Sequence, residues 1–201
     1  MLVIGITGPS GAGKSVASEY LNSKNVTLID ADAVYHNVIS PPSACLDELV
    51  IEFGKQILTD SGELNRAALA NLVFGDENYA RLETLNSITH KYVVARIRER
   101  LAELACAKVK VCAIDAPLLI EAGLTSDCNI TLAVLADKDL RAKRIAIRDG
   151  IDAERAMARI NSQKPDEYYA LGVDSVIYNN GTADELYEMV ENALADGGVT
   201  L

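Results

Sequence analysis

One short segment near the amino terminus constrains this chain more than any other. Residues 8–15 read Gly-Pro-Ser-Gly-Ala-Gly-Lys-Ser, which fits the spacing G-x-x-x-x-G-K-[ST]. The segment follows a strand-like apolar run, Leu2–Ile6, and opens a stretch in which apolar residues recur at helical spacing. A glycine-rich turn between a strand and a helix lets backbone N–H groups converge on phosphate oxygens. The segment predicts a phosphate-binding loop, the alternative being a glycine-rich turn without a ligand.

The positions of this loop have separate expected roles. The glycines let the backbone wrap around the phosphates, Lys14 bridges the β- and γ-phosphates, and the Ser15 hydroxyl ligates Mg²⁺. ATP and Mg²⁺ are therefore the expected co-substrate and ion. The predicted ATP-binding residues are Gly8, Gly11, Ala12, Gly13, Lys14, Ser15, Val16 and Arg148.

Five short apolar runs rich in β-branched residues suit strands that are buried on both faces of a parallel sheet. Helical patterns separate several of these runs, and such alternation is typical of an α/β fold with helices covering the sheet. The runs are Leu2–Ile6, Val26–Ile29, Val109–Ile114, Ile130–Leu135 and Val176–Tyr178.

Two regions break this alternation because they contain helical patterns and no convincing strand. We therefore expect one domain over residues 1–201, a P-loop NTPase-type parallel sheet core with a helical substrate-binding insertion and a helical lid. The core is predicted at residues 1–39, 108–137 and 172–201, the insertion at about 40–107 and the lid at about 138–171.

Composition excludes several classes of protein. The chain has 29 acidic and 19 basic residues, a formal net charge of −10, which argues against a general nucleic-acid binder. No apolar run approaches the roughly 18–20 residues that span a bilayer, and the first residues do not resemble a signal peptide. The four cysteines lack metal-binding spacing and read as buried thiols rather than disulfides. We expect a cytoplasmic protein with no nucleic acid, membrane or obligate protein partner.

Acidic residues follow two of the predicted strands, at the edge where open α/β sheets place ligands. A carboxylate in Asp30-Ala-Asp32 could take the proton of an attacking hydroxyl, although aspartates there also suit helix caps. Asp115 ends the third strand, where a carboxylate could hold Mg²⁺ indirectly or through water, or could be a turn residue before Pro117.

Arg141, Arg144 and Arg148 have i, i+3 and i+7 spacing and so share one face of a predicted helix. Guanidinium groups in a row suit a polyphosphate, while a solvated charged face is the alternative. Neither His36 nor His90 has other metal-ligating residues at a suitable spacing, so no zinc site is expected. His90 could contact an acceptor phosphate or have a structural role.

A phosphate loop alone does not separate kinases, GTPases and motor ATPases. The chain has no Asn-Lys-x-Asp element of a GTPase, and its five predicted strands are few for a large ATPase core. Small-metabolite kinases are compact and add an acceptor-binding insertion and an arginine-bearing lid, which match the two helical regions. A nucleotide-dependent regulatory module without an acceptor is the alternative from another class.

Motifs along nearly the whole chain resemble the dephospho-CoA kinase family. The resemblance implies ATP-dependent phosphorylation of the ribose 3′-hydroxyl of dephospho-CoA, the final step of coenzyme A synthesis. The matching residues are Gly8–Ser15, Asp30-Ala-Asp32, Phe53-Gly54, Asp60-Ser-Gly-Glu-Leu-Asn-Arg66-Ala-Ala-Leu69, Phe74, His90, Asp115-Ala-Pro117-Leu-Leu, Glu121, Leu124, Arg144-Ile-Ala-Ile-Arg148-Asp149, Gln163, Asp174 and Asn179-Asn180.

The resemblance also implies roles for individual residues. Asp32 would be the base, while Lys14 and Arg144 would stabilise the transferring phosphoryl group. Arg148 would face the nucleotide, and Asp32, His90 and Asp115 would contact the acceptor. This chain has Val16, Lys91 and Tyr169 where the family usually has Thr, Pro and a basic residue. Another small-metabolite kinase, acting on nucleotides or shikimate, is the nearest alternative.

Overall fold

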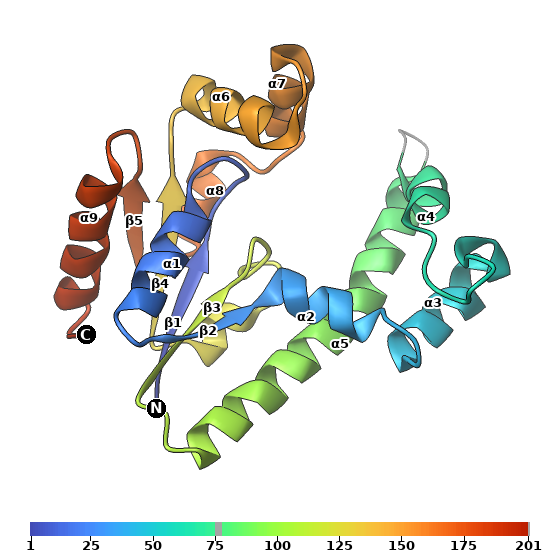
Figure 1. Cartoon of the computed structure of the whole chain (residues 1–201), viewed down its shortest axis with the longest axis horizontal. Coiled ribbons are helices and arrows are strands. Elements are labelled where there is room, and N and C mark those ends of the chain that lie inside the picture. Colours follow the sequence, from blue (N-terminus) through green and yellow to red (C-terminus); the bar gives the residue numbers. More distant parts are fainter. Residues whose placement is uncertain (75–77, 201) are drawn as a thin grey trace. The chain divides into compact units, whose positions relative to one another are not determined.

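The computed structural model describes residues 1–74 and 78–200, and these residues form two compact units. The first unit contains residues 1–30 and 104–201, and the second contains residues 31–103. Figure 1 shows a sheet with surrounding helices in the first unit and helices in the second. Each unit is described by itself below.

A five-stranded sheet forms the centre of the first unit, with the strand order β2-β3-β1-β4-β5. Every pairing between neighbouring strands is parallel, which confirms the predicted fold class. The strands are β1 (Leu2–Thr7), β2 (Thr27–Asp30), β3 (Val111–Asp115), β4 (Ile130–Leu135) and β5 (Ser175–Tyr178).

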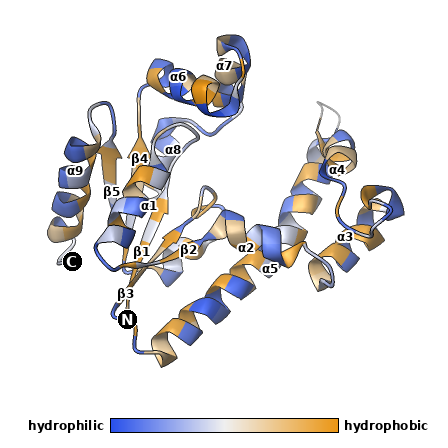
Figure 2. Ribbon diagram, in the orientation of Figure 1, coloured by the Kyte–Doolittle hydropathy of each residue, from blue (hydrophilic) through white to orange (hydrophobic). Residues whose placement is uncertain are grey.

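The two faces of the sheet pack against different helices. On β4, Leu132 and Val134 join the core that includes helices α1 (Lys14–Ser23) and α9 (Ala183–Asp196). Ala133 and Leu135 lie in a separate core with Tyr169 of α8 (Asp166–Leu171). This alternation follows from the two-residue period of a strand. Figure 2 shows the hydrophobic residues along β4 and β5 and the mixed surface of α9.

Helix α6 (Lys138–Asp149) and helix α7 (Ala153–Asn161) pack against each other through an apolar core of their own. The helix pair is separated by Gly150, whose φ of 65° closes α6. The predicted lid region thus contains α6, α7 and α8. Between β3 and β4 lies a 3₁₀ turn, Leu124–Asp127.

Helices make up most of the second unit, as the sequence predicts for this region. They are α2 (Ala31–Val38), α3 (Ala44–Phe53), α4 (Arg66–Val73) and α5 (Tyr79–Cys106), whose last residues belong to the first unit. A 3₁₀ turn, Lys55–Ile57, follows α3. The shared core contains Ile39, Cys45, Leu49, Phe53, Ile57, Leu69, Val73 and Ile88.

Local sequence signals explain where several helices begin. The side chain of Ser43 accepts a hydrogen bond from the backbone N–H of Leu46, and Asn65 does the same for Ala68. Thr182 and Glu185 form a reciprocal capping box at the start of α9. These caps satisfy N–H groups that would otherwise lack an intrahelical partner.

All four cysteines are free thiols, which confirms the expectation that they form no disulfide. The expectation that all of them are buried is wrong for Cys106, which is exposed at the end of α5. Burial raises the pKa of the Cys128 thiol to about 12. Across residues 1–74 and 78–200, no helix is both long and apolar enough to cross a membrane.

Candidate active site

The phosphate loop lies between β1 and α1, and its shape depends on glycine at three positions. Gly8, Gly11 and Gly13 have φ angles of 136°, 78° and 100°, a region that L side chains rarely adopt. An added Cβ at Gly8 would lie 2.1 Å from the carbonyl oxygen of Val134. At Gly13 it would lie 2.1 Å from Nδ2 of Asn179. The loop therefore requires glycine for both backbone angle and space.

Asn179 fixes the loop from the carboxyl end of β5. Its buried side chain donates a hydrogen bond from Nδ2 to the carbonyl oxygen of Ala12, at 2.8 Å. Asn179 had no predicted role in the site. Its position directly after the last strand was the available signal, because the carboxyl ends of parallel strands meet at one sheet edge.

The two reactive side chains of the loop differ in environment. Lys14 donates a hydrogen bond from Nζ to the carbonyl oxygen of Gly8, at 2.9 Å, so its ammonium group lies over the loop. Ser15 is exposed in the first turn of α1, where its hydroxyl is accessible to an ion. Val16 packs against the core of the sheet, so its place in the site rests on its backbone.

Asp115 ends β3 at the same edge of the sheet. It lies opposite Ile6 of β1 and Asp30 of β2 in the strand register. Its Oδ2 accepts a 2.6 Å hydrogen bond from the hydroxyl of Ser18 on α1. This contact orients the carboxylate beside α1, the helix that begins with Lys14 and Ser15.

Arg144 and Arg148 of α6 reach the phosphate loop with their guanidinium groups. Nη1 of Arg144 lies 3.4 Å from the carbonyl oxygens of both Gly11 and Ala12, and burial lowers the pKa of this guanidinium. Arg148 donates from Nη2 to Oγ of Ser10 at 3.4 Å. Arg148 also forms a bidentate ion pair with Asp149, at 2.7 and 3.0 Å.

Arg141 behaves differently from its neighbours on α6. The prediction that all three arginines line a common phosphate-facing row is wrong for Arg141, whose side chain is 2% exposed. The first turn of α6 packs on the loop, so the Arg141 guanidinium bonds to protein groups around Ser10 instead. The i, i+3, i+7 spacing gives a shared helix face but does not show what covers each end of it.

The remaining predicted residues belong to the second unit. Asp32 is exposed in the first turn of α2, two residues after the end of β2. His90 is half-buried on α5. Lys91, which follows it, donates to both carboxylate oxygens of Glu48 on α3, and the Tyr92 hydroxyl bonds the same carboxylate. With lysine in place of proline, α5 continues through His90 without a break.

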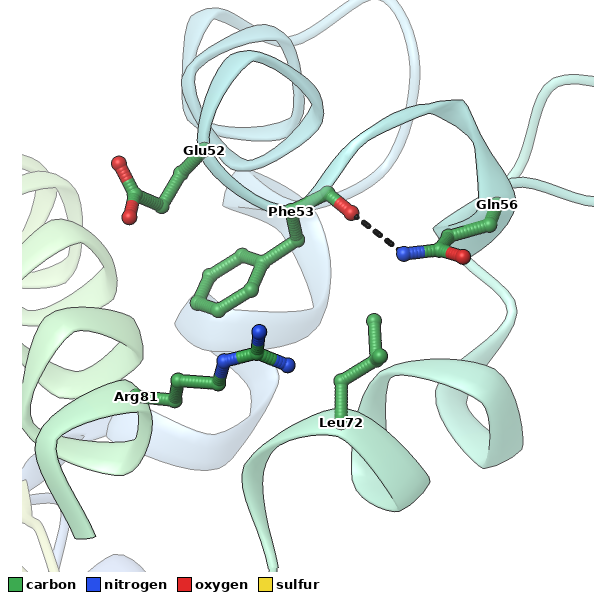
Figure 3. A pocket seen from close by; sticks show the side chains of 5 residues that line it. All are labelled: Glu52, Phe53, Gln56, Leu72 and Arg81. Carbon is green, nitrogen blue, oxygen red and sulfur yellow. Dashed lines mark hydrogen bonds between the residues drawn. The ribbon is translucent and has the colours of Figure 1, made fainter. Parts of the chain in front are cut away.

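The second unit also carries a small hollow of about 130 Å³. Figure 3 shows its lining, with the Phe53 ring above the guanidinium of Arg81 and Leu72 opposite. Nε2 of Gln56 donates to the carbonyl oxygen of Phe53 at 3.0 Å, and Glu52 lies at the rim. Both a cationic and an anionic group line this hollow.

The parallel sheet, the phosphate loop and the arginines on α6 define the class of protein: a P-loop enzyme of the small-metabolite kinase type. Solved structures share this fold. The chain has a TM-score of 0.79 and 31% identity with a Thermus thermophilus protein, covering 97% of each chain. It has a TM-score of 0.54 with shikimate kinase from Bacteroides thetaiotaomicron, at 15% identity and over 98% of this chain and 99% of that one.

Sequence comparisons are more specific. A sequence model of dephospho-CoA kinase matches residues 2–185. Dephospho-CoA kinase of Corynebacterium efficiens is 36% identical over 196 residues, 98% of this chain and 97% of the relative. Dephospho-CoA kinase of Thermobifida fusca is 37% identical over 186 residues, 92% and 91% of the two chains. The chain belongs to the dephospho-CoA kinase family, as the resemblance predicted.

Proposed function

We propose that this chain transfers the γ-phosphoryl group of ATP to the ribose 3′-hydroxyl of dephospho-CoA, giving coenzyme A and ADP, the final step of coenzyme A synthesis. The observation that carries this proposal is the match to the family over residues 2–185. The phosphate loop supports it, because the loop contains Lys14 and has Asp115 and Arg144 beside it. The reaction has little covalent chemistry for the protein to perform, so positioning and charge dominate.

Charge stabilisation is assigned to Lys14 and Arg144. Both cations bond to loop carbonyl oxygens, so a bound polyphosphate would offer each of them a more strongly charged partner at short range. Bound nucleotide would lie along the N–H groups of Gly8, Gly11, Ala12, Gly13, Lys14, Ser15 and Val16. Arg148 is assigned to the nucleotide because it is exposed beside Ser10.

Magnesium suits the donors present. Mg²⁺ keeps several waters and uses few protein oxygens together with substrate phosphates. The exposed Ser15 hydroxyl and, through water, the oriented Asp115 carboxylate would hold it. When bound, it neutralises charge on the phosphate oxygens. Among the described residues no group of three or more His, Cys, Asp or Glu side chains could hold a metal ion, which fits this mode of binding.

Asp32 is assigned as the base that takes the 3′-hydroxyl proton. Asp32 is exposed in the first turn of α2, where an acceptor hydroxyl could approach it. His90 is assigned to the acceptor, which the helical insertion would bind, and residues 138–171 are assigned as a lid that excludes water. We place the enzyme in the cytoplasm, where its two substrates meet.

A coupled ADP-release assay, run with and without dephospho-CoA, tests the proposal. We expect ADP release to depend on dephospho-CoA and to be weak with shikimate or a nucleoside monophosphate in its place. ATP binding without stimulation by any acceptor would support a regulatory module and contradict the proposal. Faster turnover with shikimate than with dephospho-CoA would assign the chain to another small-metabolite kinase.

A further inference from the structure

Ser10, the third residue of the phosphate loop, is held on both sides of its backbone by side chains from distant parts of the first unit. Its N–H donates to Oε1 of Gln163 at 3.2 Å, and its carbonyl oxygen accepts from Nε of Arg141 at 3.0 Å. Gln163 lies between α7 and α8, and Arg141 lies on α6. The peptide groups around Ser10 are thus fixed by residues of the predicted lid region.

Arg141 and Gln163 also bond to each other. Nη2 of Arg141 donates to Oε1 of Gln163 at 2.7 Å, the atom that accepts from Ser10. The contacts form a closed ring from Ser10 N–H through Gln163 and Arg141 back to the Ser10 carbonyl oxygen. Outside this ring, Nη1 of Arg141 donates a hydrogen bond to Oδ1 of Asp166 on α8, at 3.3 Å.

Burial makes each hydrogen bond of this ring costly to lose. The Arg141 side chain is 2% exposed, and its burial lowers the pKa of the guanidinium, with Asp166 acting in the opposite direction. A buried cation is tolerated only where its donors are satisfied. Three different groups satisfy them here, so losing one member of the ring leaves a buried polar atom without its partner.

The backbone of α6 touches the same part of the loop. An added Cβ on Gly11 would lie 2.8 Å from the carbonyl oxygen of Arg141 and 3.2 Å from its Cα. The first turn of α6 is therefore packed directly on the loop. This part of the predicted lid region supports the loop, and a lid movement would involve only the more distant turns of α6 and α7.

We infer that Arg141 and Gln163 are positioning residues that hold the Ser10 peptide and thereby set the directions of the loop N–H groups that bind the ATP phosphates. Phosphate binding depends on those directions. Neither side chain needs to touch ATP for its loss to weaken binding. The inference rests on the proposed function only in taking ATP as the ligand of the loop.

Gln163→Met tests the inference, since methionine keeps the length of the side chain but removes the acceptor atom. We expect about a tenfold weaker ATP Kd and faster amide hydrogen exchange in the peptide that contains residues 8–13, with an unchanged KM for dephospho-CoA. Gln163→Glu keeps an acceptor for Ser10 and Arg141 and should restore the slow exchange. Gln56→Met is the matched control, because Gln56 is an exposed glutamine of the second unit whose side chain donates to the carbonyl oxygen of Phe53.

A double-mutant cycle with Arg141→Lys tests the ring itself. We expect the double variant to be no worse than either single variant, because each one already opens the ring. An ATP Kd for Gln163→Met within twofold of wild type, unchanged exchange at residues 8–13, or additive effects of the two substitutions would overturn the inference. ATP binding is measured without acceptor. These measurements therefore test the inference even if the chain does not phosphorylate dephospho-CoA.

Discussion

The two units hold their polar groups in different ways. In the first unit, the phosphate loop is tied by buried or half-buried groups from β5, α6 and the α7–α8 turn, including Asn179 and Arg141. In the second unit, the Lys91–Glu48 pair lies between exposed helix faces, with side chains 57% and 36% exposed. Protein groups therefore hold the shape of the phosphate loop, whereas the Lys91–Glu48 pair of the second unit stays in contact with solvent.

This difference predicts two kinds of mutational effect. Removing one partner from a buried network costs several times more than removing one from an exposed pair. Changes around the phosphate loop should affect folding and ATP binding together. Changes to exposed residues of the second unit should affect chemistry or acceptor binding while the free energy of unfolding stays nearly constant.

Asp32→Asn should give the largest effect on turnover. Asparagine cannot take the hydroxyl proton, and loss of a general base typically lowers kcat by about 10²–10⁴-fold. Because Asp32 is exposed in the second unit, the ATP Kd and the free energy of unfolding should change little. Asp60→Asn, another exposed aspartate of that unit, is the control and should retain wild-type turnover. Substantial turnover by Asp32→Asn in the ADP-release assay would contradict the base assignment.

Lys14→Ala should lower kcat by about 10²–10³-fold, because a charge that stabilises the transition state is lost. The measurement is steady-state turnover at saturating ATP. Lys24→Ala, at the other end of α1, removes an exposed partner of Glu191 and should have almost no effect on rate. Equal effects of the two substitutions would show that Lys14 acts only on the stability of α1.

Gly11→Ala and Gly62→Ala compare the two units at nearly the same backbone angle, with φ values of 78° and 81°. An alanine at Gly62 meets nothing within 4 Å, so only the backbone strain of about 1–2 kcal/mol applies. At Gly11 the new methyl group also meets the α6 backbone, which adds about 1–3 kcal/mol. Urea unfolding followed by circular dichroism checks this order, and a larger loss for Gly62→Ala would contradict it.

Glu48→Gln should have the smallest effect, and one that depends on pH. The hydrogen bond from Lys91, followed by that from Tyr92, holds the pKa of Glu48 below its ordinary value of 4.5. A lowered pKa in the folded state stabilises the protein above the unfolded-state value, and the stabilisation is lost as pH falls through the folded-state value. As pH falls from above 4.5 through the lowered folded-state pKa of Glu48, wild type should therefore lose its small advantage over Glu48→Gln. A constant difference in thermal midpoint over that range would contradict this.

The strands and the phosphate loop could be predicted because their signals are local. Each strand is a run of apolar residues, and residues 8–15 carry both the turn and the reactive side chains. Asn179 and Gln163 could not be assigned in the same way, since they reach the loop from 167 and 153 residues away. The burial of Arg141 could not be predicted either. Its spacing places it on the same helix face as Arg144, but packing of α6 on Gly11 buries it.

Family membership was predictable from motifs that cover the chain, while the roles of Asp32, His90 and Arg148 stay predictions. Their side chains are exposed or half-buried, so the fold alone does not determine what they contact during the reaction. Tyr169 is a different case: it lies in the core beside β4, which explains why an aromatic residue fits where the family usually has a basic one.

The position of the transferred phosphate tests the central claim most directly. The protein would be incubated with ATP, Mg²⁺ and dephospho-CoA, and the product examined by mass spectrometry and phosphorus nuclear magnetic resonance. We predict one new phosphate monoester on the ribose 3′-hydroxyl, formed in equal amount to ADP. Release of inorganic phosphate with dephospho-CoA left unchanged, or a phosphate on another hydroxyl, would contradict the account.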